Sequence, residues 1–195
     1  MVASTKNTYT FSEDGKVGYG GVSTGLIFIF DSEDFEKICH KRWYQFNRGK
    51  NGIYYIGDSK GNAIHRLIMN PPKGYEVDHI DLNPLNNSKR NLRICTHQQN
   101  QYNQPLQINN TSGFCGVRYY SPRKKYIARI KLNQKDIHLG YYETIIEAAQ
   151  ARNVATELLF GEYGVISDVA EPPDWIIKKV LDKCSRLVNK AAVFI

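Results

Sequence analysis

Four side chains between residues 78 and 100 have the types and the spacing that could support hydrolytic chemistry. His79 follows Asp78 directly. Asn91 lies 12 residues after His79, and Asn100 lies 9 residues after Asn91. Carboxylate and carboxamide oxygens are hard donors that suit Mg²⁺ or a similar cation, and histidine is the usual general base near neutral pH. The structural alternative is a polar turn at Asp78 and His79, with Asn100 on the surface of a helix.

Two short strands and a polar loop are expected to carry the first three of these side chains. The segments Tyr75–Ile80 and Asn91–Ile94 read as strands. Asp81–Arg90 lies between them and contains one proline and three asparagines, which favour a loop. A strand, a loop and a second strand that fold back on each other would bring the three side chains together.

A short helix is expected to follow the second strand and to carry Asn100. Thr96 and Gln99 match a capping box, in which the threonine caps the helix and the glutamine bonds back to it. The helix should run from about His97 to Tyr102, and Pro105 bars its continuation. The spacing of the four side chains, together with this capped helix, favours the functional interpretation over the structural one.

Residues 1–64 read as short strands, turns and one helix, without evident chemistry. Glycines punctuate the start of this region. Strands are expected at Leu26–Phe30, Ile53–Ile56 and Ala63–Met69. Apolar residues at helical spacing predict a helix over Asp31–Lys41, with Ser32 as its cap.

Residues 109–164 have the pattern of a three-stranded sheet followed by a helix. Strands are expected at Gly116–Tyr120, Lys125–Leu132 and Asp136–Tyr142, and the middle one alternates with period two. An amphipathic helix should cover Thr144–Phe160, where small alanines would let it lie close to the sheet. A last helix is expected over Glu171–Ile195, packed on a neighbouring domain, with dimerisation as the weaker alternative.

The composition indicates a folded, basic protein that binds a polyanion. The 195 residues are 42% hydrophobic and carry a net charge of +7, with a pI near 9.2. This balance favours nucleic acid or acidic membrane as the partner. Seven basic residues and one acidic residue lie between residues 112 and 142. They fall on predicted strands and not on an amphipathic helix, which favours nucleic acid.

Neither a membrane span nor a signal peptide is expected. The sequence has no run of about 18 apolar residues, which excludes a membrane-spanning protein. Residues 1–14 lack a basic region followed by an apolar core. We therefore expect a cytoplasmic protein with no membrane partner.

The four cysteines give no sign of a zinc site. Cys39, Cys95, Cys115 and Cys184 form no C-x-x-C pair, whereas a structural zinc cage usually takes its ligands from close pairs. In a reducing compartment they are expected to be ordinary buried thiols. Cys39 and the neighbouring His40 have no evident partner in the sequence.

The segments HRLIMN, GYEVDHIDLNPLNN and KRNLRICTHQQN, within His65–Asn103, resemble the HNH endonucleases, specifically the homing-type variants of phages and bacteria. An asparagine, Asn100, takes the last position, as in the H-N-N subgroup. The resemblance implies that Asp78 and Asn100 hold one divalent cation, Mg²⁺ in the first place or Mn²⁺, and no zinc. It also implies that His79 deprotonates the attacking water, and that Asn91 orients His79 through a hydrogen bond and pins the loop.

Other polar residues of this stretch have secondary roles. Arg93 lies between the site residues and is expected to hold DNA. Asn86 and Asn87 are expected to make loop hydrogen bonds, and either could take the middle role from Asn91. His65 is expected to be structural.

The segments GFCGVRYY, KYIARI, HLGYYET and EAAQARNVATELLFGEYG resemble the plant ethylene-response-factor type of DNA-binding domain. That domain is a three-stranded sheet backed by one helix, and its sheet enters the major groove. Tyr126 stands where the plant family usually has tryptophan, and Arg129 and His138 stand where its pattern has glutamate and tryptophan, so base preference does not carry over. The resemblance implies DNA contacts from four sheet residues and from two in the intervening turn: Arg118, Arg129, Lys131 and His138, and Arg123 and Lys124.

The expected fold is α+β. It comprises a ββα-metal hairpin and a three-stranded antiparallel sheet packed on one helix, with a small mixed N-terminal region. We expect four segments: an N-terminal region at 1–64, the HNH nuclease at 65–108, the DNA-binding domain at 109–164, and a C-terminal helix at 165–195.

The expected function is metal-dependent hydrolysis of double-stranded DNA by a site-directed homing endonuclease of a bacterial or phage-infected cell. One hairpin holds one metal ion and cuts one strand, so a monomer or weak dimer should nick its target. The alternative is a non-enzymatic, sequence-specific DNA-binding regulator with a vestigial nuclease hairpin. The loss of Asp78, His79 or Asn100 would have favoured the regulator, and all three are present.

Overall fold

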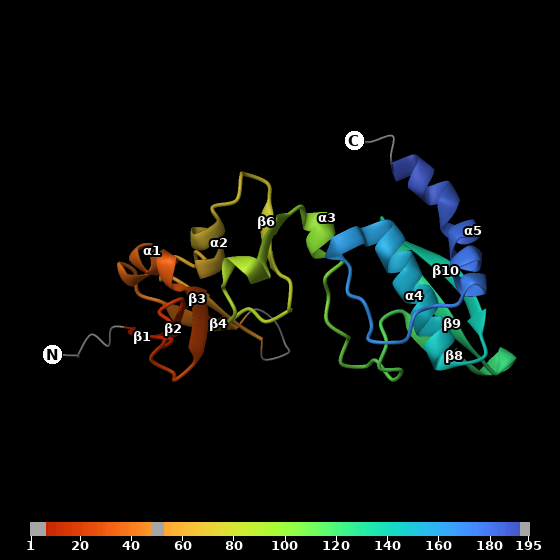
Figure 1. Cartoon of the computed structure of the whole chain (residues 1–195), viewed down its shortest axis with the longest axis horizontal. Coiled ribbons are helices and arrows are strands. Elements are labelled where there is room, and N and C mark those ends of the chain that lie inside the picture. Colours follow the sequence, from red (N-terminus) through yellow and green to blue (C-terminus); the bar gives the residue numbers. More distant parts are fainter. Residues whose placement is uncertain (1–6, 48–52, 192–195) are drawn as a thin grey trace. The chain divides into compact units, whose positions relative to one another are not determined.

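The computed structural model describes residues 7–47 and 53–191, which group into two compact units (Figure 1). The first unit is Met1–Gln101 and the second is Tyr102–Ile195. Helices and small antiparallel sheets occur in both, so the expected α+β class is confirmed. The finer division into four segments stays a prediction.

The described part of the first unit combines antiparallel sheets with short helices. One sheet has the order β1-β2-β3, and two hairpins pair β4 with β5 and β6 with β7. The elements in chain order are β1 (Thr8–Phe11), β2 (Val17–Gly21), β3 (Ile27–Asp31), η1 (Ser32–Asp34), α1 (Phe35–Cys39), β4 (Tyr44–Asn47), β5 (Tyr54–Gly57), α2 (Ile64–Met69), β6 (Glu76–His79), η2 (Lys89–Asn91), β7 (Leu92–Cys95) and α3 (His97–Asn100).

Two phenylalanines of β3 form the centre of the core of the first unit. Phe28 and Phe30 are fully buried, and the register places them opposite Gly20 and Gly18 of β2. Residues that pair across a sheet have their side chains on the same face. A Cβ atom at either glycine would overlap the opposite ring, so the two glycines make room for the aromatic core.

The prediction of a strand at Ala63–Met69 is wrong, because this segment forms the helix α2. Ile64 and Ile68 are four residues apart and both buried, so one face of a helical turn buries them together. Asn70 ends the helix in the left-handed conformation, with φ 44°. A short apolar run does not distinguish a strand from a buried helix by periodicity alone.

Two other helices are shorter than expected. The segment predicted as a helix at Asp31–Lys41 is a 3₁₀ turn over Ser32–Asp34 followed by α1, and Ser32 lies inside the turn and is not its cap. The helix α3 ends at Asn100, before the expected Tyr102, and its predicted capping box is present.

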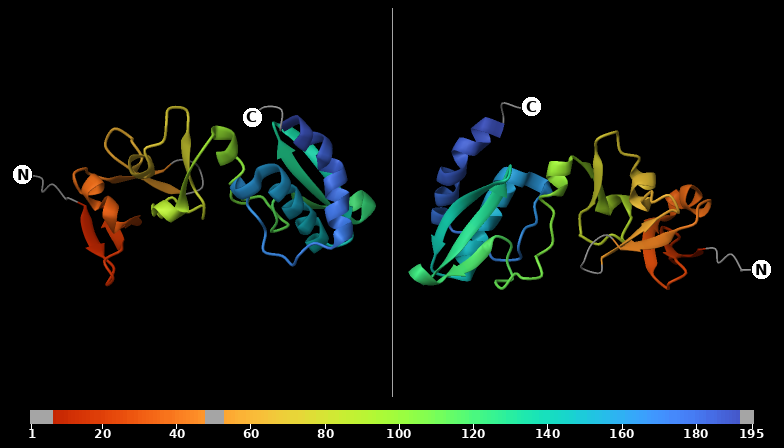
Figure 2. Two further views of the ribbon diagram at one scale, coloured as in Figure 1. Left: turned by 45° about the horizontal axis from the view of Figure 1, so that its top comes forward. Right: turned by 180° about the vertical axis from the view of Figure 1, so that it is seen from behind.

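The second unit contains a three-stranded antiparallel sheet, with the order β10-β9-β8, and a helix that lies along one of its faces (Figure 2). All three predicted strands occur, and so does the helix, but the prediction that this helix is amphipathic is wrong, because Gln150, Arg152 and Asn153 are buried along with its alanines. The elements are β8 (Val117–Tyr120), η3 (Ser121–Arg123), β9 (Lys125–Leu132), β10 (Lys135–Tyr142), α4 (Ile145–Phe160), η4 (Gly161–Tyr163) and α5 (Asp174–Ala191).

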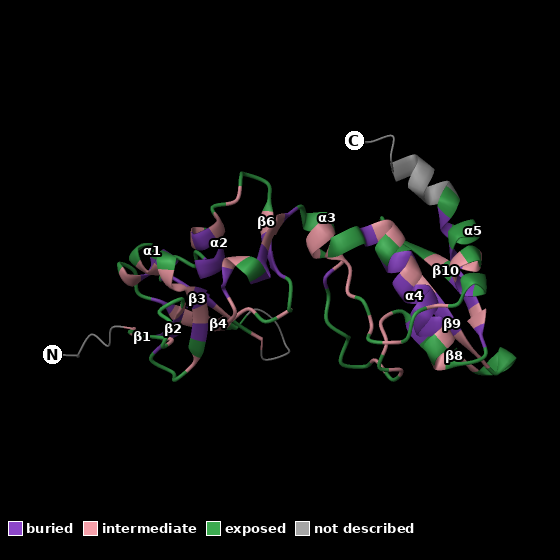
Figure 3. Ribbon diagram, in the orientation of Figure 1, coloured by how far each residue is buried: buried purple, intermediate pink, exposed green. Residues whose placement is uncertain are grey.

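The core of the second unit lies between this sheet and the two long helices (Figure 3). The small side chains Ala148, Ala151 and Ala155 of α4 are fully buried, so the helix backbone lies close to the strands. Ile176 and Val180 of α5 are buried in the same core. The C-terminal helix therefore packs against α4 and β10 within the second unit.

None of the helices in the described part of the chain is both long and apolar enough to cross a lipid bilayer.

The glycine positions of β2 lead to a stability prediction. Gly20→Ala should destabilise the first unit by about 1–3 kcal/mol, because the added methyl group overlaps the buried Phe28 ring. Trp43 is buried in this unit, so urea unfolding followed by its fluorescence in a Trp175→Phe background measures the loss. Gly21→Ala is the matched control, because its methyl group meets only the exposed Thr8 side chain. Equal stability of the two alanine variants would contradict this description of the core.

Candidate active site

The hairpin of β6 and β7 positions most of the predicted site residues. Asp78 lies opposite Arg93 in the register, and His79 lies opposite Leu92. Side chains alternate along a strand, so Glu76 and Asp78 share one face of the hairpin and His79 points to the other. The helix α3 packs against both strands.

Asp78 is buried and forms an ion pair with Arg93. Its side chain is 5% exposed, and its Oδ2 accepts hydrogen bonds from Nε and Nη2 of Arg93 at 2.8 and 2.7 Å. A buried carboxylate needs a compensating charge, and this guanidinium supplies it. Arg93, which we expected to hold DNA, is therefore a partner of the predicted metal ligand.

Glu76 holds the predicted ligand on α3. The Nδ2 atom of Asn100 donates to Glu76 Oε2 at 2.6 Å, and Nδ1 of His97 lies 2.8 Å from Oε1. The hydrogen bond from Asn100, and to a smaller extent the one from His97, lowers the pKa of Glu76 below its usual value. Since the carboxamide is planar and its nitrogen faces Glu76, the carbonyl oxygen of Asn100 points away from Glu76.

His79 is held by Asn87 in a defined tautomer. Its Nε2 lies 3.3 Å from Asn87 Oδ1. The amide nitrogen of Asn87 donates to the carbonyl oxygens of Leu85 at 3.2 Å and Pro84 at 3.4 Å, so its oxygen must face the ring. Nε2 of His79 is then the protonated donor, and Nδ1 carries the lone pair.

Burial keeps His79 in the form that a base requires. The residue is 6% exposed, and this burial lowers the pKa of His79, against the opposing effect of the hydrogen bond with Asn87. The ring is therefore neutral near pH 7. The ring of His65 in α2 meets the His79 ring edge-on, with the ring centroids 4.9 Å apart. The centroid of the Tyr55 ring in β5 lies 6.3 Å from that of His79. His65, which we expected to be structural, thus forms part of the wall around His79.

Asn91 pins the loop, and it is Asn87 that contacts His79. The Oδ1 atom of Asn91 accepts from the backbone N–H of Asp81 at 3.0 Å, and Nδ2 donates to Asp81 Oδ1 and to the carbonyl oxygen of Asn86, each at 2.8 Å. The resemblance assigned the contact that orients His79 to Asn91. In the structure, Asn87, one of the two asparagines considered as alternatives, makes this contact.

The N-terminal region fixes this loop from outside. The carbonyl oxygen of Ile29 in β3 accepts from the backbone N–H of Asn87 at 2.8 Å, and the N–H of Ile29 donates to Leu85 at 2.7 Å. Asp31 Oδ2 accepts from the N–H of Lys89 at 2.7 Å. The Lys89 ammonium pairs with Asp34 at 3.1 Å and with Glu33. The N-terminal region, which offered no chemistry in the sequence, is therefore the support of the loop.

The predicted DNA contacts in the second unit lie on the side of the sheet away from α4. Arg118 pairs with Ile127, and His138 with Arg129, so these side chains share a face with Lys131. The opposite face carries the core residues that pack against α4. Arg123 and Lys124 are exposed in the turn between β8 and β9.

Tyrosine rings contact Arg118 and Arg123, two of these predicted DNA contacts. The guanidinium of Arg123 lies 4.5 Å from the centre of the Tyr141 ring, and that of Arg118 lies 5.8 Å from Tyr120. The ring of His138 lies 4.7 Å from Tyr141. Such stacking restricts the long side chains before any ligand binds, which lowers the entropic cost of binding.

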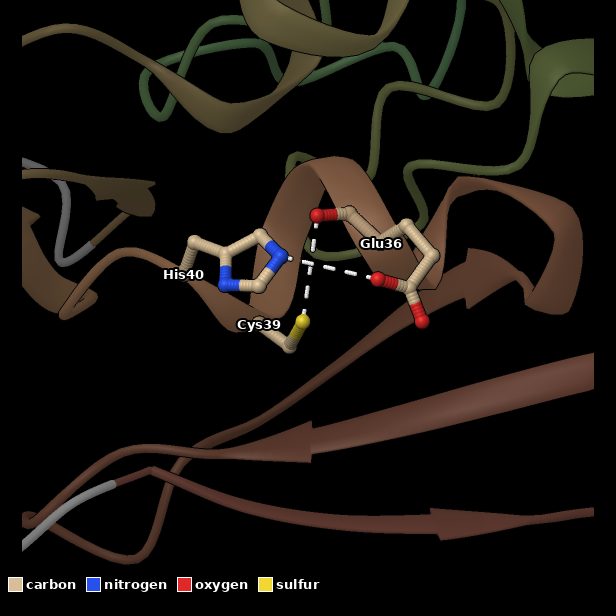
Figure 4. A group of neighbouring side chains, drawn as sticks. All are labelled: Glu36, Cys39 and His40. Atoms are coloured by element: carbon tan, nitrogen blue, oxygen red, sulfur yellow. Dashed lines mark hydrogen bonds and ion pairs between the residues drawn. The ribbon is translucent and has the colours of Figure 1, made fainter.

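A separate group of ligand-type side chains lies on α1 and just after it (Figure 4). His40 Nε2 lies 3.5 Å from Glu36 Oε2, and the Cys39 thiol donates to the Glu36 carbonyl oxygen at 3.7 Å. The expectation that Cys39 and His40 lack partners is therefore wrong. Helical spacing explains the grouping, since residues three and four apart are neighbours. The ionic side chains are largely exposed, and the prediction of no zinc stays a prediction.

His79, oriented by Asn87, lies on the same strand–loop–strand–helix unit as the carboxylate of Asp78 and the carboxamide of Asn100, and a base and hard oxygen donors on one such unit can support metal-assisted hydrolysis. Comparison with known proteins agrees. The sequence pattern described as HNH endonuclease matches residues 63–102. An uncharacterized HNH endonuclease of Acanthamoeba polyphaga mimivirus is 36% identical over 143 residues, which are 70% of this chain and 72% of that protein. The chain therefore belongs to the HNH endonuclease family.

A second relative matches a shorter stretch. Protein 3.8 of Escherichia phage T7 is 42% identical over 55 residues, which are 28% of this chain and 46% of that protein. The chain thus spans less than half of that relative. No solved structure matches the chain. The resemblance of residues 109–164 to the ethylene-response-factor domain remains a prediction.

The contact between His79 and Asn87 predicts a specific defect. Asn87→Ala should leave the imidazole free to populate both tautomers, whereas Nε2 is protonated in the parent chain. Imidazole ¹⁵N shifts of His79 measure the tautomer, and cleavage of DNA should fall by about 10-fold or more, as for other residues that orient a functional side chain.

Asn83→Ala is the matched control, because Asn83 lies in the same loop and its side chain accepts a hydrogen bond from the nearby backbone N–H of Leu85. It should keep both the tautomer and the rate. A single His79 tautomer in Asn87→Ala would show that Asn87 does not orient the ring.

Proposed function

We propose that this chain is a metal-dependent DNA endonuclease in which His79 activates water for hydrolysis of a phosphodiester bond. The observation that carries the proposal is the buried, neutral His79, whose Nε2 is held by Asn87. Its Nδ1 can then take a proton from water. Attack of that water in line with the leaving 3′ oxygen yields a 5′ phosphate and a 3′ hydroxyl.

Asp78 and Asn100 are the proposed ligands of one divalent cation. HNH nucleases generally use a divalent metal ion, and the donor set here fits one, because a carboxylate and a carboxamide carbonyl are hard oxygen ligands. When bound, Mg²⁺ or Mn²⁺ would stabilise negative charge on the phosphate and on the leaving oxygen. Glu76 orients Asn100, and the pairing with Arg93 shows that Asp78 already attracts positive charge.

Arg93 has two proposed roles, one before and one after a cation binds Asp78. In the structure it compensates the charge of Asp78. When a cation binds Asp78, the guanidinium can turn to a neighbouring phosphate, to which it offers two parallel donors. The exchange of Asp78 for a phosphate would let Arg93 make both the observed ion pair and the expected DNA contact.

The sheet of the second unit is the proposed DNA reader. Arg118, Arg129, Lys131 and His138 lie on one face, with Arg123 and Lys124 at its end, and that face is rich in arginine and tyrosine. A two- or three-stranded sheet fits the major groove, where base edges can be distinguished. With one hairpin per chain, the proposed product is a nick, and site-directed action of the homing type would follow from the reader.

One observation favours the alternative of a DNA-binding regulator with a vestigial nuclease hairpin. The carboxylate of Asp78 is already neutralised by Arg93, so a cation must compete for it. Metal-dependent cleavage separates the two functions, since a regulator would bind DNA without cutting it.

Plasmid cleavage tests the proposal directly. Supercoiled plasmid should convert to open circles with Mg²⁺ and should stay intact with EDTA. His79→Ala should lower the rate by about 10²–10⁴-fold, because the base is lost, while gel retardation of DNA is kept. His40→Ala is the control, since that histidine is exposed on the surface near α1. Equal rates for parent and His79→Ala would eliminate His79 as the base.

The role of Glu76 is tested by metal binding without DNA. Glu76→Ala removes the carboxylate that orients Asn100, so the affinity for Mn²⁺ should weaken by about 10–100-fold. Electron paramagnetic resonance of free Mn²⁺ measures this affinity independently of cleavage. Glu13→Gln, at an exposed position, is the control for lost charge. An unchanged Mn²⁺ affinity in Glu76→Ala would remove Glu76 from the site.

A further inference from the structure

The helix α5 carries a groove that the proposed cutting and reading residues do not explain. Its volume is about 480 Å³, and it is lined by Trp175, Lys178, Lys179, Asp182 and Lys183. Residues 175, 179 and 183 succeed each other at intervals of four, so they follow one row along the helix. Three ammonium groups face a single carboxylate, which leaves the groove with an excess of positive charge.

Lys179 connects this groove to the edge strand β10. Its Nζ donates to the carbonyl oxygen of Tyr141 at 3.1 Å and lies 4.2 Å from the centre of the Tyr142 ring. Gly140 makes this approach possible, because a Cβ atom there would lie 2.8 Å from Cε of Lys179. The end of the Lys179 side chain is thus fixed against the sheet.

The charges of α5 reach the proposed reading face. Burial lowers the pKa of His138, and the cations Arg129, Lys183, Arg123 and Lys179 lower it further, in that order. Arg129 and Arg123, two of the proposed DNA contacts, and Lys183 and Lys179 of α5 therefore act electrostatically on the same side chain, His138. Tyr141 joins the two groups geometrically, because its ring contacts Arg123 and His138 and its carbonyl oxygen accepts from Lys179 of α5.

A surface with this charge is suited to a row of phosphates. Clustered cations repel one another, and a polyanion relieves that repulsion and releases its own counterions. Trp175 is 49% exposed and offers an apolar wall beside the lysines, against which a deoxyribose can pack. An acidic peptide would satisfy the charge equally, but it would not explain the continuity with the reading face.

We propose that the groove on α5 binds the phosphodiester backbone of the DNA duplex that the sheet reads. The proposal rests on the proposed function of that sheet. It gives the C-terminal helix a role in DNA binding beyond packing: the sheet contacts the groove of the duplex, and Lys178, Lys179 and Lys183 contact the adjacent strand of phosphates.

The salt dependence of DNA binding tests the proposal. Binding of the full-length chain to a fluorescent, mixed-sequence duplex is measured in EDTA by anisotropy over a range of salt concentrations. Lys183→Gln should weaken binding and lower the slope of log affinity against log salt by about 0.9, and Lys178→Gln/Lys183→Gln should lower it by about 1.8. These lysines are chosen because Lys179 also bonds to β10. Asp182→Asn should tighten binding.

Two further variants separate the possible outcomes. Lys16→Gln, at an exposed position in the first unit, is the control for lost charge and should keep the slope. Arg118→Gln should weaken binding through the sheet. If Arg118→Gln weakens binding and the α5 variants match the parent, the groove proposal is overturned while the proposed function stands. If both sets match the parent, the sheet itself is not the reader, and the groove proposal fails with it.

Discussion

The hydrogen bond between Asn87 and His79 is the contact on which the proposed chemistry depends. It determines which imidazole nitrogen carries the lone pair that accepts a proton, and it needs the loop between β6 and β7 to hold one conformation. Asn87 donates within that loop, Asn91 ties the two ends of the loop together, and Ile29 fixes it from β3. A loop with so few apolar residues has no core of its own, so hydrogen bonds must fix it.

Charge compensation governs the other face of the hairpin. Asp78 and Glu76 lie two residues apart on one strand face, where they would repel each other in a site of low polarity. Arg93 compensates the first, and the Asn100 amide and His97 satisfy the second. The same arrangement places the carboxamide nitrogen of Asn100 toward Glu76 and the guanidinium of Arg93 against the carboxylate of Asp78. Removal of Arg93 leaves the buried carboxylate of Asp78 without this compensating charge, which costs more than the contact itself contributes.

Much of the fold follows from local patterns, and most of the site geometry does not. The capping box at Thr96, the hairpin strands and the three-stranded sheet were predictable, because each depends on residues close in sequence. The helix α2 was misread because its apolar run suits a strand equally well. Asn87 and Asn91 are chemically identical, so only the conformation of the loop decides between them. The support from Asp31 to Lys89 joins residues 58 positions apart, for which the sequence offers no signal.

The two cores explain how the proposed cutting and the proposed reading of DNA can vary independently. The core around Phe28 and Phe30 contains residues of the first unit, and the core of α4, α5 and the sheet contains residues of the second. A substitution in one core perturbs the residues packed there, because close packing transmits strain locally. Base recognition needs the exposed face of the sheet to change, and hydrolysis needs the hairpin to stay constant. Since Arg118 and Arg123 contact tyrosines of the same sheet, the proposed specificity can change without disturbing the hydrogen bonds that orient His79.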